Sequence, residues 1–347
     1  MANDLVLITG ATGHIGFRTL RYLLEYGYNV RAAVRSVAKG EAIKSNPLLK
    51  DVSTSQLSFV VVSDFLAPGA FDKAAEGVKY IVHLASPIPF GDGADPADQE
   101  EHFVKPAVRG TISMLESAKK VGTVKRVVIT SSMVVNIPID VQFGITESAD
   151  TYTAESRISM PEPPYANTFV AYIASKVGAI KEAEAWMEGN KGVGFDAVHV
   201  HPAYTIGRDD TALTSKAVNE GTNSAMLGTV LGETAGYGKT STTVHVDDAA
   251  RVHVLALNPE VAGNQSFLTV SDGPDGTIWE DSLKHVKKHF PKAVADGSLP
   301  NNGTAPTVKN NFDASKTEKT FGFVHKSYEE QVVSVVGHYL ELLQKGL

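Results

Sequence analysis

The feature that most constrains the fold of this chain is a glycine-rich turn directly after its first apolar segment. Residues Leu5–Thr9 form a continuous apolar run, which is typical of a strand buried on both faces of a parallel sheet. The following segment, His14–Tyr26, has the apolar period of a helix. A strand, a glycine turn and a helix in this order bring backbone N–H groups close to a phosphate. We expect a dinucleotide pyrophosphate site to be formed by Gly10, Thr12, Gly13, His14, Ile15 and Gly16.

Apolar runs and helical periods alternate along the first two hundred residues. The expected strands are Leu5–Thr9, Asn29–Val34, Phe59–Val62, Lys79–Leu84, Val124–Thr130 and Phe195–His201. Helical periods lie between them, and Phe169–Gly189 is the longest. This alternation predicts an α/β protein with a Rossmann-type doubly wound parallel sheet.

The composition changes after Pro202, toward Gly, Thr, Ser and Ala. We expect residues 1–205 to form the nucleotide-binding domain, with 241–264 returning to it. A smaller C-terminal substrate-binding region is expected from 206–240 and 265–347, with loops over much of 271–310. An amphipathic helix is expected over Tyr328–Leu343.

The charge and cysteine content of the 347 residues exclude several classes of function. The net charge is −7 and no cysteine is present, so disulfides, thiolate nucleophiles and cysteine metal sites are excluded. The acidic balance argues against a nucleic-acid partner. His199 and His201 lack a third ligand nearby in sequence, so no metal site is predicted. No basic and apolar leader or bilayer-spanning run is apparent, and we expect a cytoplasmic monomer or homodimer without a membrane partner.

The end of the second expected strand distinguishes between the two nicotinamide cofactors. An NAD site places an acidic residue there to accept the ribose 2′-hydroxyl, and this chain has Arg35 instead. An arginine can pair with a 2′-phosphate through two hydrogen bonds, and Ser36 and Lys39 can add donors. The alternative is a solvated surface arginine. The pattern favours NADP(H) over NAD(H).

Later strand ends supply the other expected cofactor contacts. Asp64 and Phe65 are expected near the adenine, while His83 is expected to be a packed residue at a strand end. Contacts to the nicotinamide half are expected from Leu84, Ala85 and Ser86, and Thr130 and Ser131 are further expected cofactor contacts.

A tyrosine and a lysine four residues apart predict a catalytic helix. Tyr172 and Lys176 lie on one helix face because of this spacing. A nearby ammonium favours the phenolate form, so the tyrosine can give a proton to a carbonyl oxygen. Ser131 and Ser132 end a strand upstream, where a serine hydroxyl can hold that oxygen.

These ordered motifs resemble the extended short-chain dehydrogenase/reductase superfamily, closest to its dihydroflavonol reductase, cinnamoyl-CoA reductase and fungal methylglyoxal/ketone reductase branch. The resemblance covers nearly the whole chain. It rests on the segments Gly10–Gly16, Val34–Arg35, His83–Pro87, Pro106–Thr111, Val127–Ser132, Tyr172–Lys176, Val244–Val254 and Phe312–Lys316.

The resemblance implies roles for individual residues. Ser132, Tyr172 and Lys176 would be catalytic, Pro202 would lie beside the nicotinamide, and Arg35 would select NADPH. Relatives often carry a Gly-Pro pair after that proline, whereas this chain has Tyr204–Arg208, so the pocket wall there is expected to differ.

The leading hypothesis is an NADPH-dependent reductase that converts a ketone or aldehyde to an alcohol. An NAD-dependent sugar-nucleotide epimerase or dehydratase and a non-enzymatic NADP-sensing protein are the alternatives. An apolar or aromatic small-molecule carbonyl substrate is expected from the pocket residues Ile88, Phe90, Met133, Val134, Phe143, Tyr165, Phe169, Tyr204 and Met226.

Overall fold

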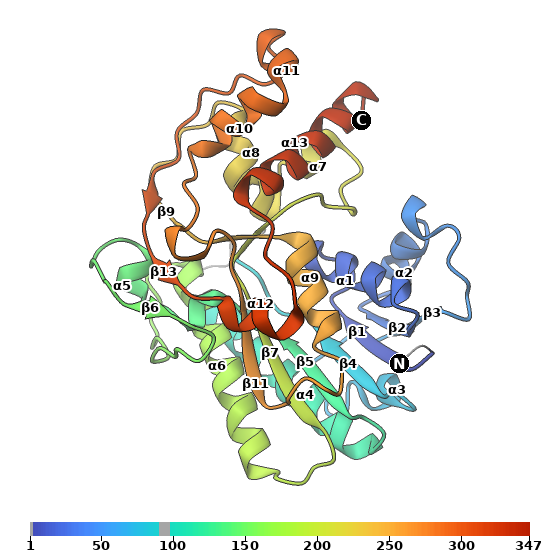
Figure 1. Cartoon of the computed structure of the whole chain (residues 1–347). Coiled ribbons are helices and arrows are strands. Elements are labelled where there is room, and N and C mark those ends of the chain that lie inside the picture. Colours follow the sequence, from blue (N-terminus) through green and yellow to red (C-terminus); the bar gives the residue numbers. More distant parts are fainter. Residues whose placement is uncertain (1–2, 90–97) are drawn as a thin grey trace. The chain divides into compact units, whose positions relative to one another are not determined.

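The computed structural model describes residues 3–89 and 98–347, and the chain folds into two compact units (Figure 1). The first unit contains Met1–Val135, Arg157–His201 and Ala250–Phe267. The second contains Asn136–Ser156, Pro202–Ala249 and Leu268–Leu347. Within the described part of the chain, no helix has the length and apolar character needed to cross a bilayer.

These units divide the chain differently from the expected domain boundaries at four places. The second unit contains Asn136–Ser156, residues 202–205 and residues 241–249, whereas residues 265–267 belong to the first. The 136–156 excursion has a physical cause in its strand β6 (Thr151–Tyr152), which pairs with β13 (Asn311–Phe312) far along the chain. A two-residue strand carries no periodic signal that sequence could show.

The first unit is organised around a seven-stranded sheet in the order β11-β7-β5-β4-β1-β2-β3. The strands are β1 (Leu5–Thr9), β2 (Asn29–Val34), β3 (Leu57–Val61), β4 (Tyr80–His83), β5 (Arg126–Thr130), β7 (Asp196–Pro202) and β11 (Gln265–Thr269). Neighbouring strands run parallel in the part of the sheet ordered β7-β5-β4-β1-β2-β3. The chain leaves β1 toward β2 on one side and returns to β4 on the other, so the β1 and β4 ends flank the switch point where doubly wound sheets bind ligands.

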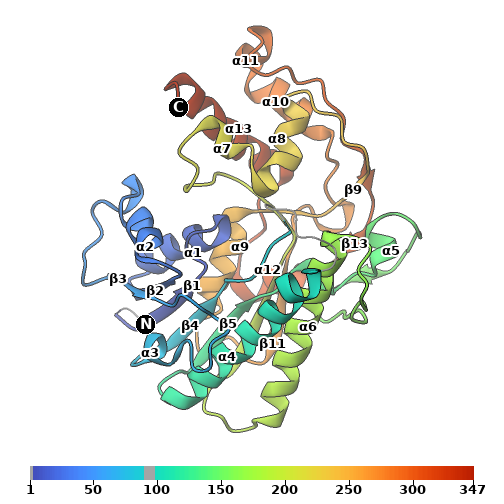
Figure 2. The same cartoon turned by 180° about the vertical axis from the view of Figure 1, so that it is seen from behind.

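Helices α3 (Asp72–Ala75), α4 (Lys105–Val121) and α6 (Thr168–Gly189) contribute to one core cluster against the sheet. Figure 2 shows α4 and α6 side by side. Both the expected sheet and the long helix are therefore confirmed. A π-helical segment, Glu100–Val104, directly precedes α4. Helix α1 (His14–Glu25) packs on β1 and β2, and helix α2 (Val37–Lys44) packs on β2.

The second unit has its own core around Trp279, which is fully buried. Its helices are α5 (Ile139–Gln142), α7 (Ser215–Val218), α8 (Ser224–Val230), α10 (Asp281–His289), α11 (Pro291–Ala295), α12 (Ser315–Phe321) and α13 (Tyr328–Gln344), and α9 (Val246–Leu255) begins in this unit. The expectation of loops over 271–310 was wrong for α10 and α11. Helix α10 packs on α13, but its nine residues contain only two apolar side chains, Leu283 and Val286, so the segment has the polar composition of a loop.

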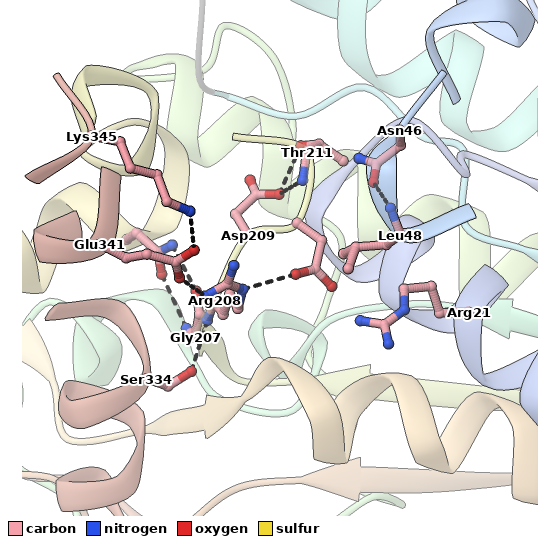
Figure 3. A network of polar contacts seen from close by, with 12 residues as sticks. Arg21, Asn46, Leu48, Gly207, Arg208, Asp209, Thr211, Ser334, Glu341 and Lys345 are labelled. Atoms are coloured by element: carbon pink, nitrogen blue, oxygen red, sulfur yellow. Dashed lines mark hydrogen bonds and ion pairs between the residues drawn. The ribbon is translucent and has the colours of Figure 1, made fainter. Parts of the chain in front are cut away.

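Arg208 ties the segment after β8 (Tyr204–Ile206) to α13 within the second unit (Figure 3). Its guanidinium donates to Glu341 at 2.6 Å and to Asp210 at 3.1 Å, and its backbone N–H donates to the Ser334 hydroxyl at 2.9 Å. Glu341 also accepts from Lys345 at 2.8 Å. Together these cations lower the pKa of Glu341 to about 2.

Candidate active site

The turn after β1 has no room for side chains at its first and third glycines. Gly10 has φ +75°, and a Cβ there would lie 2.8 Å from the backbone nitrogen of Ala85. A Cβ on Gly16 would lie 2.0 Å from the carbonyl oxygen of Gly10. These contacts hold β1, α1 and the segment after β4 close together, which is the packing that a dinucleotide turn requires.

The middle of the turn is open. Gly13 is the N-cap of α1, and a Cβ there would meet nothing closer than 3.6 Å. Neither a side-chain cap nor an acidic residue occupies the first turn of α1, and Thr12 and Gly13 are exposed whereas His14 and Ile15 are half-buried. A helix N-terminus in this state attracts anions. The turn therefore fits a diphosphate.

The end of β2 presents two cations to solvent. Arg35 and Lys39 are exposed, and the Arg35 guanidinium has no hydrogen-bond or ion-pair partner in the described chain. Ser36 is the N-cap of α2, where its hydroxyl oxygen accepts from the Lys39 backbone N–H at 3.4 Å. Arg35 is thus available to an anionic ligand, while Ser36 also has a structural role.

Asp64 and Phe65 follow β3. The Asp64 carboxylate accepts from the Leu66 backbone N–H at 2.8 Å, and the Phe65 ring packs edge-on against Phe71 with centroids 4.9 Å apart. Both residues therefore have structural partners, and their predicted contact with adenine stays a prediction.

His83 ends β4 as a buried, neutral residue. Its Nδ1 lies 3.0 Å from the Thr9 hydroxyl, which also accepts from the Ala85 backbone N–H at 3.1 Å. Burial, together with the positive charge of Lys176, lowers the pKa of His83 to about 4. This network fixes the backbone of Leu84, Ala85 and Ser86, and the packed role expected for His83 agrees with its surroundings.

The catalytic residues expected from the sequence come together within the first unit. The Tyr172 phenol on α6 lies near the Ser132 side chain, two residues after β5, which acts on the pKa of the phenol. Burial raises the pKa of Tyr172, and the contact with Ser132 partly offsets this. The phenol is therefore protonated at neutral pH and can donate to an oxygen.

Lys176 lies one helical turn from Tyr172, as the spacing predicts. Its ammonium is 5.8 Å from the centre of the Tyr172 ring and 3.5 Å from the Thr130 carbonyl oxygen, to which it donates. Lys176 is 5% exposed, and burial lowers its pKa to about 8. The Lys176 ammonium therefore loses its proton within the pH range in which enzymes are usually assayed.

The expected pocket residues have different surroundings. Ile88 is exposed, Met133 and Val134 are buried beside Ser132, and the Phe169 ring lies 5.8 Å from the Tyr172 ring. Phe90 falls outside the described residues. The Tyr165 hydroxyl donates to the Glu100 carboxylate.

Within the second unit, Met226 is fully buried in the core, Phe143 is partly exposed, and Tyr204 packs edge-on against Trp279. Pro202 ends β7 and is buried. Among the described residues, no group of three His, Cys, Asp or Glu side chains is arranged to hold a metal ion.

Comparison with known proteins identifies the family. Residues 6–267 match the NAD dependent epimerase/dehydratase family. The chain belongs to this family. It is 48% identical over 351 aligned positions to ketoreductase CTB6 of Cercospora beticola, covering 99% of this chain and 97% of that protein. The recognised resemblance to the reductase branch of the extended short-chain dehydrogenase/reductases is thereby confirmed.

Solved structures share the fold over almost the full length. A reductase engineered to attenuate substrate inhibition in asymmetric catalysis is 26% identical, with a TM-score of 0.80, covering 97% of this chain and 99% of that one. Gre2 from Candida albicans, solved with NADPH, is 24% identical with a TM-score of 0.81, covering 98% and 99%. The Rossmann-type fold is therefore confirmed.

The structure also brings forward residues to which the sequence assigned no role in the site. His199 on β7 and Thr111 on α4 line a small cavity together with Lys176. The sequence indicated His199 only as one of two histidines that lacked a third metal ligand nearby. Its position on the α6 side of the sheet depends on strand register, which the local sequence does not fix.

Proposed function

We propose that this protein is an NADPH-dependent carbonyl reductase in which Tyr172 gives its proton to the oxygen of a ketone or aldehyde. The contact between the Tyr172 phenol and Ser132, with Lys176 one helical turn away, carries this proposal. The 48% identity to a ketoreductase over nearly the whole chain also supports the proposal.

Each residue of this group has a distinct task in the proposed reaction. Ser132 and Tyr172 both offer hydroxyl hydrogens, so a carbonyl oxygen bound beside them accepts two hydrogen bonds that strengthen as negative charge develops. The Lys176 ammonium stabilises the phenolate that remains after proton transfer. A bound nicotinamide cofactor supplies the hydride that reduces the carbonyl carbon.

The cofactor preference rests on the end of β2. No carboxylate follows Val34 to accept a ribose hydroxyl, and the exposed guanidinium of Arg35 is able to pair with a 2′-phosphate. We therefore assign NADP(H) as the cofactor, with the diphosphate at the N-terminus of α1. The substrate we assign is a small apolar or aromatic carbonyl compound.

A second candidate function is an NAD-dependent epimerase or dehydratase. It is favoured by the family that residues 6–267 match and by a 33% identical relative from Alternaria alternata, the NAD-dependent epimerase/dehydratase ALT6. The absence of an acidic residue after Val34 argues against it.

Both candidates are tested by one assay. Purified protein is mixed with a panel of aliphatic and aromatic ketones and aldehydes, separately with NADPH and NADH, and oxidation of the cofactor is followed by absorbance. The proposal predicts turnover that is faster with NADPH and lost in Tyr172→Phe. Tightly bound NAD in the purified protein, with no net oxidation of either cofactor, would establish the second candidate instead.

A further inference from the structure

A small cavity lies within the first unit, beside Lys176. Residues from β4, β5, β7, α4 and α6 and the segment after β4 line it, and the polar ones are His83, Ser86, Thr111, Thr130, Ser131, Lys176 and His199. Its size allows about one water molecule. The proposed reaction uses Lys176 from this lining but assigns no role to Thr111 or His199.

Two polar atoms on the cavity wall lack a protein partner. The Ser131 hydroxyl and His199 Nδ1 are both buried without a hydrogen bond to any described residue, and the two residues are only 6% and 4% exposed. Three other polar side chains of the lining have protein partners: the Thr111 hydroxyl donates to the Ala107 carbonyl at 2.8 Å, His83 Nδ1 contacts Thr9, and the Thr130 hydroxyl lies 2.7 Å from His253 Nε2. Buried polar atoms left in this state generally bind ordered water.

The Lys176 ammonium is the third hydrogen-bonding group at such a water site. An ammonium has three N–H donors, and the described contact at hydrogen-bonding distance is the 3.5 Å one to the Thr130 carbonyl. A water in the cavity can accept from Lys176 and donate to the ring nitrogen of His199, with Ser131 as a further partner. Three hydrogen bonds are typical of a buried water molecule.

We propose that Ser131 and His199 hold a water molecule against Lys176, and that this water stabilises the charged ammonium and fixes its direction. Ser131 and His199 are then positioning residues, because they act on the reacting groups through Lys176. The water site is inferred from the cavity and its two unpartnered polar atoms alone. Its importance for catalysis rests on the function proposed above.

The charges around the cavity are consistent with a neutral His199. Burial lowers the pKa of His199 to about 4, and Glu184 of α6 and Arg157, which form an ion pair at 2.7 Å, act on it in opposite directions. His83 of β4 faces Lys176 and is also neutral above its low pKa. Thr111 of α4 carries no charge. Lys176 is therefore the group on this wall that titrates near pH 8.

The test measures the protonation of Lys176 without any cofactor or substrate. The full chain is labelled with 13C at the lysine ε carbons, and the Lys176 signal, assigned by its absence in Lys176→Arg, is titrated by NMR. Removing the water's acceptor in His199→Leu should lower the pKa of Lys176 by about half a pH unit or more. Ser131→Ala should lower it in the same direction, and His199→Gln, which keeps a polar atom, should restore most of the wild-type value.

The matched control is His338→Leu. His338 on α13 is another buried histidine with an unpartnered Nδ1, but it does not line the cavity, so its loss should leave the Lys176 titration unchanged. Equal titration curves for the wild-type protein, His199→Leu and Ser131→Ala would overturn the proposal. So would a crystal structure of the wild-type chain with a dry cavity.

Activity separates this inference from the proposed function. If the reductase proposal holds, His199→Leu should shift the alkaline limb of the kcat profile to lower pH while the KM for NADPH stays unchanged. If no carbonyl compound is reduced, the proposed function fails while the NMR titration still decides whether the water site exists.

Discussion

The carbonyl oxygen of Gly10 lies 2.0 Å from the position that a Cβ atom would take on Gly16. This distance is far below any van der Waals contact, and the oxygen belongs to the backbone of a turn that itself has φ +75°. The first and third glycines of the turn are therefore required by packing between β1 and α1, independently of any ligand.

Gly16→Ala should therefore destabilise the protein, because neither α1 nor the turn can move away without losing packing against β1. We expect a loss of about 2–3 kcal/mol in the free energy of unfolding, measured by urea denaturation followed by circular dichroism.

The comparison is Gly13→Ala, where the nearest atom would be 3.6 Å away. This variant should keep its stability within about 0.5 kcal/mol yet bind NADPH more weakly, because the methyl group would fill the space above the N-terminus of α1. Equal stability of the two variants would contradict the packing argument.

The sequence predicted those parts of the site that lie close together along the chain. Gly10, Gly13 and Gly16 form one turn, and Tyr172 and Lys176 share one helix face, so periodicity and spacing were sufficient. The contact between Tyr172 and Ser132 joins residues forty positions apart and was anticipated only through strand order and the family resemblance.

Other features depend on long-range packing and were not predictable. The burial that lowers the pKa of Lys176 comes from α4, α6 and the sheet together. The same applies to the place of His199 in the cavity. The excursion of 136–156 into the second unit rests on the pairing of β6 with β13, a two-residue match without a local signal.

Tyr172→Phe should abolish most of the proposed reductase activity, because the phenol is the proposed proton donor. A general acid contributes about 10²–10⁴-fold, and we expect kcat for ketone reduction to fall within that range. Ser132→Ala should cost about 10²–10³-fold, as expected for the loss of a hydrogen bond to a developing oxyanion.

The control measurement is the affinity for NADPH, followed by cofactor fluorescence. It should change little in either variant if their role is chemical. A loss of affinity that accounts for the whole loss of activity would show that Tyr172 and Ser132 only help to bind the cofactor.

His83 and His199 should make the protein sensitive to acid. Burial lowers both pKa values to about 4, from an ordinary value of 6.5. The unfolded chain therefore takes up protons at a higher pH than the folded one. The stability that each neutral histidine contributes is complete above pH 6.5 and is lost as the pH falls toward 4. Each residue accounts for up to about 3 kcal/mol of this loss.

Urea denaturation at several pH values between 7 and 4 measures this effect. In His83→Asn the decline in stability over this interval should be smaller than in the wild-type protein, although the variant is less stable at pH 7 because the bond to Thr9 changes. An unchanged decline would show that carboxylates, and not His83, govern the acid sensitivity.

Arg35→Ala should weaken NADPH binding without weakening NADH binding. Arg35 is exposed at the end of β2, so water screens its charge, and a paired hydrogen bond to a phosphate there is worth about 1–2 kcal/mol. The Kd for NADPH should therefore rise about tenfold, and fluorescence titration with each cofactor measures this.

The control is Lys44→Ala. Lys44 is another exposed cation, at the last turn of α2, and its ammonium lies 4.0 Å from the Glu41 carboxylate. If both substitutions weakened NADPH binding equally, the effect would come from overall charge, and Arg35 would not recognise the 2′-phosphate.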